Sequence, residues 1–203
     1  MNLEATVDNR VTRWELVGIL LIIAFGTTLH FWFEWTNYWR PMAIIAAVNE
    51  STWEHFKMAF WPGLFFGVVE YFVWGKEHRG FIPAKFLGLL AMPAITMILF
   101  YGYTAFWHHN LPADIAVFVA SVAGGQLLSL WILRKEFNWP AWFRGVSVAG
   151  LILMIAAFST QSYFPRKNFV FAHPGTGEYG ILDDYSDHDH GDDDHDEDDE
   201  DEH

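Results

Sequence analysis

The sequence predicts an all-α protein: a polytopic bundle of about five transmembrane helices, with a re-entrant or interfacial segment and a disordered C-terminal tail. Three observations support this fold class. Hydrophobic residues make up 52% of the 203 residues, and aromatic residues 18%. Five stretches approach the roughly 20 apolar residues that a helix needs to cross a bilayer. Finally, the net charge of −13 lies almost entirely in residues 183–203, which contain 14 acidic residues and no Lys or Arg.

The predicted spans cover about residues 16–35, 53–74, 86–107, 113–133 and 145–163. Tryptophan and tyrosine cluster at their ends, as expected for side chains at the membrane–water interface. The first stretch follows two arginines, but it is too long for a signal peptide and no small-residue cleavage site follows it. We therefore expect it to be a retained membrane helix.

A shorter apolar run, Met42 to Val48, lies between the first two spans. It has too few residues to cross the membrane. A re-entrant or interfacial segment is the expected structure, which leaves the number of full spans at five.

The distribution of Lys and Arg predicts the orientation. With the N-terminus in the cytoplasm, eight basic residues fall on the inner side and four on the outer side. The inner residues are Arg10, Arg13, Lys76, Arg79, Lys85, Arg134, Lys135 and Arg144, and the outer ones are Arg40, Lys57, Arg166 and Lys167. By the positive-inside rule the N-terminus is cytoplasmic and the C-terminal tail is extracytoplasmic.

Composition divides the chain into a transmembrane domain, residues 1–182, and an Asp/His-rich tail, residues 183–203. The first part is nearly neutral, with 11 acidic and 12 basic residues. Such a body is too apolar for an ordinary soluble domain, and no basic patch is present to neutralise nucleic-acid phosphates. The chain has no Cys, which excludes disulfides, thiolate metal sites and a Cys nucleophile.

Histidines and acidic residues gather at the outer ends of the predicted helices. Imidazole and carboxylate ligands without thiolate suit borderline divalent ions such as Zn, Fe, Mn, Co or Ni. We therefore predict a metal site. The candidate ligands are His30, Glu34, Glu50, Glu54, His55, His108, His109 and His173.

Structural roles compete with this interpretation at several positions. Glu54 could serve only as the partner of Ser51 in a capping box, which is the pattern S-T-W-E. His30 and Glu34 could form a helix-packing contact, while Glu50, His108 and His109 could be solvated residues at the interface. Lys57 could neutralise one of the carboxylates. On the inner side, Glu70 could reach Lys76 in the same way.

The tail interleaves its acids with four histidines, His188, His190, His195 and His203. So much like charge prevents the segment from collapsing, so we expect disorder. It is predicted to collect metal ions weakly and at many points, with a purely solvating tail as the alternative.

Two motifs resemble a known family. Residues 48–57 read V-N-E-S-T-W-E-H-F-K, and residues 173–181 read H-P-G-T-G-E-Y-G-I. Together they resemble a family of small multi-pass bacterial membrane proteins of unknown function. The family pattern has an acidic residue where this chain has His173. The resemblance implies a protein of the bacterial inner membrane and implies no reaction.

The leading functional hypothesis is therefore binding, transport or delivery of divalent metal ions at an outward-facing cavity. A second is a membrane enzyme with Glu50 or Glu54 as general base and His55 as acid or metal ligand. A third is a small subunit of a larger membrane complex, holding haem between His30 and His108 or His109. The expected partners are the lipid bilayer, metal ions, and further copies of the chain or other subunits, but not nucleic acid.

Overall fold

The computed structural model describes residues 3–108 and 110–181, and these form an all-helical bundle. The long helices are α1 (Leu3–Leu29), α3 (Thr52–Val73), α4 (Phe81–Thr104), α5 (Leu111–Lys135) and α6 (Ala141–Thr160). The short helices are α2 (Trp32–Trp35), η1 (Arg40–Ile44) and η2 (Gly75–Glu77). Apart from a single antiparallel bridge between Ala172 and Tyr179, the described residues contain no β-structure. The predicted fold class is confirmed.

All five long helices are apolar enough and long enough to cross a membrane. Large apolar side chains point outward along them: Leu20, Ile98 and Leu153 are each exposed by 70% or more. In water such a surface would cause aggregation, whereas in a bilayer it is the lipid-facing surface. The residues that cover the predicted tail, 183–203, lie outside the described part of the chain.

The helices pack in an order that follows from their contacts. α4 and α5 form the largest interface, α1 lies against α3 and α5, and α4 also contacts α3 and α6. Close packing of α4 on α5 depends on small residues: a Cβ at Gly88 would lie 2.8 Å from the carbonyl oxygen of Gly125. Ser121 and Ser129 flank Gly125 on the same stripe and are fully buried.

The first span differs from its predicted bounds. The helix continues back to Leu3 and ends at Leu29, and residues up to Trp35 form the separate helix α2. The chain reverses directly after α2 because Asn37 and Tyr38 both adopt left-handed backbone angles. Tyr38 then packs edge-on against Phe33, which is buried, and this contact holds the reversal in place.

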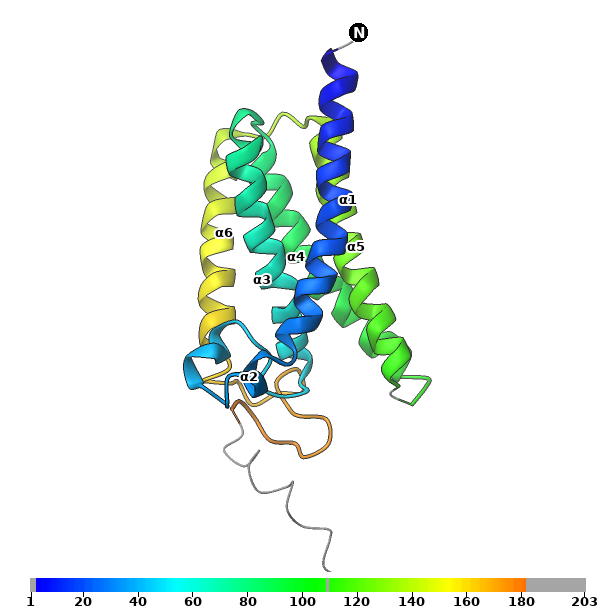
Figure 1. Cartoon of the computed structure of the whole chain (residues 1–203), viewed down its shortest axis with the longest axis vertical. Helices are drawn as coiled ribbons and strands as arrows, with labels where there is room; N and C mark the ends of the chain where they lie inside the picture. The colour runs from blue at the N-terminus through cyan, green and yellow to red at the C-terminus, as the bar shows by residue number, and fades with distance from the viewer. Residues whose placement is uncertain (1–2, 109, 182–203) are drawn as a thin grey trace, which may run out of the picture.

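One end of the bundle carries nearly all the irregular structure, as Figure 1 shows. Residues 30–51 and 161–181 cover the ends of α1 and α6 and the start of α3; we call this the loop end. The segment predicted to be re-entrant or interfacial forms η1 here, and its Ala43, Ala46 and Val48 are buried in a small cluster with Phe33. The N-terminus lies at the opposite end (Figure 1).

Candidate functional site

Three of the predicted ligands meet at the loop end. His30 Nε2 lies 3.3 Å from Glu50 Oε1, and His55 Nε2 lies 3.7 Å from Glu50 Oε2. The two imidazole rings are 5.9 Å apart between centroids. One potential ligand atom from each of the three residues falls within 4.8 Å of the others. Residues from the end of α1, the loop before α3 and the first turn of α3 thus form one cluster.

The local sequence explains how Glu50 reaches this position. The Asn49 side chain accepts a hydrogen bond from the Ser51 backbone N–H at 2.8 Å and donates one to the Gly180 carbonyl at 2.7 Å. Asn49 therefore fixes the backbone directly before α3 and also holds the C-terminal segment against the start of this helix. Gly180 has a φ of 75°, and a Cβ there would lie 2.9 Å from the Ser162 carbonyl oxygen, so only glycine fits. Glu50 lies between Asn49 and Ser51, whose positions these hydrogen bonds fix, and its side chain is half exposed.

A backbone carbonyl fixes the tautomer of His55. Its Nδ1 lies 2.9 Å from the Ser51 carbonyl oxygen, which can only accept a hydrogen bond. The proton of neutral His55 is therefore on Nδ1, and the lone pair is on Nε2, the atom that faces Glu50. A carbonyl partner of this kind orients histidine ligands in many metal sites.

Glu50 and His30 shift each other's protonation. The hydrogen bond from His30 and its positive charge lower the pKa of Glu50, and the charges of His55 and His173 act in the same direction. The hydrogen bond from Glu50 raises the pKa of His30 against the opposing effect of burial, and the negative charges of Glu50 and Glu34 add to the rise. The Nδ1 of His30 is buried and has no hydrogen-bond partner.

The spacing of these atoms fits a metal ion. With bonds of about 2.0–2.1 Å, ligand atoms in a tetrahedral site lie about 3.3–3.4 Å apart. His30 Nε2 lies at that distance, 3.3 Å, from Glu50 Oε1, and His55 Nε2 lies 3.7 Å from the other oxygen, Oε2. With one ligand atom from each residue the separations extend to at most 4.8 Å, so binding an ion would draw the three side chains closer together. Two imidazoles and one carboxylate form a recognised donor set for zinc and related ions, which leaves a coordination position open.

Two small clefts meet at Glu50. One, of about 50 Å³, is lined by His30, Glu34, Asn49 and Glu50 among others. Glu34 is exposed and lines this cleft without joining the three-residue cluster. The other, of about 40 Å³, runs between α3, α4 and α5 past His55 and Thr96.

Glu54, in contrast, is part of the structural core. It is 2% exposed, and its Oε2 accepts a hydrogen bond from Lys57 Nζ at 2.7 Å while its Oε1 accepts one from Ser162 at 2.6 Å. The expected capping box is wrong, because the Ser51 side chain makes no capping hydrogen bond. Lys57 does neutralise a carboxylate, as one alternative predicted, and that carboxylate belongs to Glu54.

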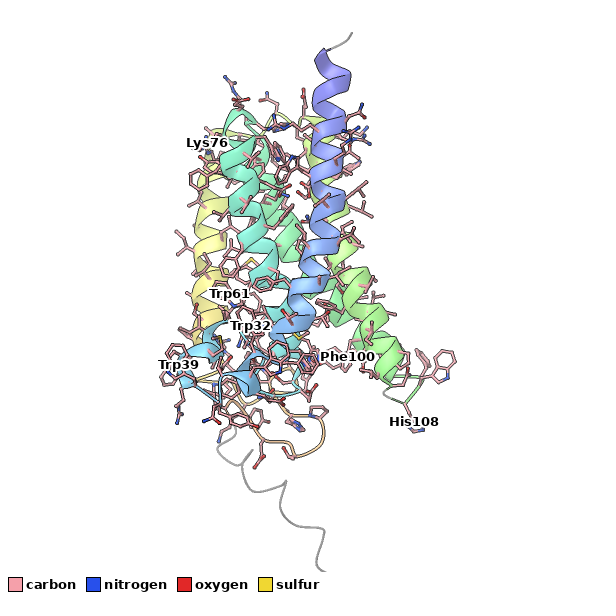
Figure 2. All side chains as sticks on the ribbon, viewed as in Figure 1. Trp32, Trp39, Trp61, Lys76, Phe100 and His108 are labelled. Atoms are coloured by element: carbon pink, nitrogen blue, oxygen red, sulfur yellow. The ribbon has the colours of Figure 1, made fainter. Side chains whose placement is uncertain are left out.

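The other predicted histidine ligands lie apart from the cluster. His108 is exposed on the α4–α5 loop, away from the α1–α2 corner in Figure 2. The position of His108 therefore gives no support to haem held between it and His30. His173 is close enough for its charge to act on Glu50, but its Nδ1 accepts hydrogen bonds from the backbone N–H groups of Gly175 and Thr176. That bonding leaves the proton on its Nε2.

Five predicted metal-binding histidines lie outside the described residues. They are His109 and the four tail residues His188, His190, His195 and His203. Their roles stay predictions.

A second polar cluster, inside the bundle, was not predicted. Lys85 of α4 contacts Glu15 of α1 and Glu70 of α3, and Ser129 of α5 also donates a hydrogen bond to Glu15. The predicted bounds had placed Glu15 and Lys85 just outside their spans. The sequence did contain a signal for this cluster, because Glu15, Glu70 and Lys85 are isolated charges of opposite sign near the ends of three apolar helices.

Comparison with known proteins identifies a family but no activity. Neither the comparison with curated proteins nor that with solved structures gave a significant match. The family model of DUF6512, described as a family of unknown function, matches residues 3–181, a range that includes every described residue. This protein therefore belongs to the DUF6512 family.

Proposed function

We propose that this protein binds a divalent transition-metal ion through His30, Glu50 and His55 and passes it on. The observation that carries the proposal is the meeting of three ligand atoms from three separate segments within 4.8 Å. The donor set contains nitrogen and carboxylate oxygen only, which favours Zn²⁺, Fe²⁺, Mn²⁺, Co²⁺ or Ni²⁺ over Ca²⁺ or Cu⁺.

The form of the site supports exchange of the ion rather than permanent storage. Structural zinc sites are closed by four protein ligands, whereas three ligands leave a position for water or for an incoming ligand. Glu50 is half exposed and both histidines are partly exposed, so an ion can enter and leave from the loop end. The Asp/His-rich tail follows the segment that Asn49 holds at this end, and we propose that it raises the local ion concentration.

Metal titration of the full-length protein in detergent tests the site. Co²⁺ is a suitable probe because its visible absorption is strongest in tetrahedral coordination. We expect wild-type protein to show a tight, tetrahedral class of sites together with weak binding by the tail. His55→Gln should remove the tight class and leave the weak one.

His108→Gln is the matched control, because His108 is an exposed imidazole of the same protein outside the cluster. It should keep the tight class unchanged. Equal tight binding by wild type and His55→Gln would contradict the proposal, and so would equal loss in both variants.

The side of the membrane that the site faces is a separate prediction. The excess of Lys and Arg at the N-terminal end of the bundle predicts that the loop end lies outside the cytoplasm. A topology reporter fused after Glu202 should therefore give an extracytoplasmic signal, and one fused in the η2 loop at Lys76 a cytoplasmic signal. The reverse pair of signals would overturn the orientation and place the metal site on the cytoplasmic side.

A further inference from the structure

The second polar cluster lies within the helical bundle, far along α1 and α3 from the metal site. Lys85 Nζ lies 2.7 Å from Glu15 Oε1 and also pairs with Glu70 Oε2. Ser129 donates a hydrogen bond to the same Glu15 oxygen at 3.0 Å. Glu15 and Glu70 are fully buried and Lys85 is 6% exposed. All three charged residues fall within candidate membrane spans.

The charges in this cluster do not balance. Two carboxylates, Glu15 and Glu70, share one ammonium, that of Lys85, and these are the charged groups that act on Glu70. Arg10 of α1 donates instead to the Val73 carbonyl, and Lys76 beside the end of α3 lies over the Phe72 ring. Both of these basic side chains are exposed at the end of the bundle. An uncompensated charge inside lipid is strongly disfavoured, so the cluster requires one additional positive charge, such as a proton.

Unpaired atoms in the cluster also point to a missing proton. Glu15 Oε2 and Glu70 Oε1 are buried acceptors without hydrogen-bond partners. Gln126 is 3% exposed, and its Nε2 is a buried donor that also has no partner, so it requires an acceptor rather than a proton. This amide nitrogen lies against α1, 2.3 Å from where a Cβ on Gly18 would be, which is one helical turn from Glu15.

The hydrogen bonds indicate which carboxylate carries the charge. Glu15 receives hydrogen bonds from both Lys85 and Ser129, which stabilise its ionised form. Glu70 has only the ion pair between its Oε2 and Lys85, and neither of its oxygens accepts a hydrogen bond. Glu70 is therefore the better place for the proton.

We propose that the Glu15–Lys85–Glu70 cluster is a proton-binding site, in which Glu70 holds an exchangeable proton at neutral pH. A proton fits better than a metal cation such as Na⁺, because the Lys85 ammonium already occupies the position between the two carboxylates. A second full positive charge there would be repelled. This site shares no residue with the metal cluster, so either proposal can fail without the other.

Polar side chains lead from the metal clefts toward the proton site. Thr96, which lines the cleft beside His55, donates a hydrogen bond to Ser121 at 2.9 Å. Along α5, Ser121 is followed by Gln126 and then by Ser129, which is bonded to Glu15. These side chains of α4 and α5 lie between the proton site and the loop end, where the metal ion is proposed to bind.

Infrared difference spectroscopy of the full-length protein in lipid nanodiscs tests the proposal. A protonated carboxylic acid has a C=O stretch that an ionised carboxylate lacks. We expect wild-type protein at neutral pH to show this band, and we expect raising the pH to remove it. Glu70→Gln should lack the band, while Glu34→Gln, which alters an exposed carboxylate at the loop end, should keep it.

Two further measurements separate a proton site from its alternatives. Glu70→Gln copies the protonated side chain, so its thermal midpoint should equal that of wild type only in acid, below the pKa of about 4.3 of a glutamate in the unfolded chain. Above that pH its midpoint should exceed that of wild type by an increasing amount, because wild type must take up a proton on folding. Adding Na⁺ in place of K⁺ should change neither the band nor the midpoint. Absence of the band in wild type, its persistence in Glu70→Gln, or its displacement by Na⁺ would each overturn the proposal.

Discussion

Lys57→Met should destabilise the protein by about 3–5 kcal/mol, the usual effect of removing one partner of a buried ion pair. Lys57 is fully buried, and its Nζ lies 2.7–2.8 Å from four acceptors, Glu54 Oε2, the carbonyl oxygens of Ala43 and Ala46, and Ser162 Oγ, which share its three N–H groups. These groups come from η1 and the loop after it, from α3, and from the segment after α6. Methionine fills similar space, so the loss reflects uncompensated charge and unpaired acceptors rather than a cavity.

The midpoint of unfolding in detergent measures this effect. Lys76→Met is the matched control, because Lys76 is exposed and its ammonium lies over the face of the Phe72 ring. The midpoint of this variant should stay near that of wild type. The double variant Glu54→Gln/Lys57→Met should recover part of the loss, since it removes the unpaired carboxylate as well. A small loss in Lys57→Met would mean that the cluster does not hold the loop end together.

The sequence predicted the transmembrane helices well because length and apolarity alone define them. The second predicted span, 53–74, corresponds to α3 at Thr52–Val73, and the fourth, 113–133, to α5 at Leu111–Lys135. The first span was less accurate. Its apolar run continues past Leu29, but α1 ends there, and after the short helix α2 the left-handed residues Asn37 and Tyr38 turn the chain back toward the bundle. Hydropathy carries no information about that turn.

The sequence predicted at which end of the bundle the candidate site lies, but it did not predict which residues form it. Glu50 and Glu54 both lie at the start of α3, yet Glu50 faces two histidines and Glu54 is bonded to Lys57 and Ser162. The Glu54–Lys57 spacing of three residues on one helix face was a usable signal for an ion pair. The contact with Ser162, which is 108 residues away, depends on how α6 packs and could not be inferred from spacing.

Metal binding at the proposed site should weaken sharply on acidification, beginning above pH 6.5. The ion requires both imidazoles to be neutral. The hydrogen bond from Glu50 raises the pKa of His30 above the ordinary value of about 6.5, so protons displace the ion from His30 at a higher pH than from an isolated histidine. Once both histidines are protonated, the affinity should fall by about 100-fold per pH unit, because two protons compete with each ion.

Glu50→Gln should weaken metal binding strongly, because Glu50 contacts both His30 and His55. Removing this charged ligand should lower the metal affinity by at least about 100-fold. Loss of a residue that only orients a metal ligand already lowers affinity by about 10–100-fold. The variant also removes the charge that raises the pKa of His30, so its residual binding should persist to lower pH than wild type. Co²⁺ titrations at several pH values measure both changes.

The stability of the protein should change with pH in opposite directions in the presence and in the absence of metal. Without metal, the ion pair of protonated His30 with Glu50 contributes stability below the raised pKa of His30, and this is lost as the pH rises through that pKa. It is also lost at acid pH, as Glu50 becomes protonated through its lowered pKa.

With saturating metal, stability should instead increase over the same neutral range, because the ion binds the neutral imidazoles of the folded state. In Glu50→Gln both trends should become small. If wild-type midpoints followed the same pH curve with and without metal, His30 and Glu50 would form only an ion pair, and the metal site would be ruled out.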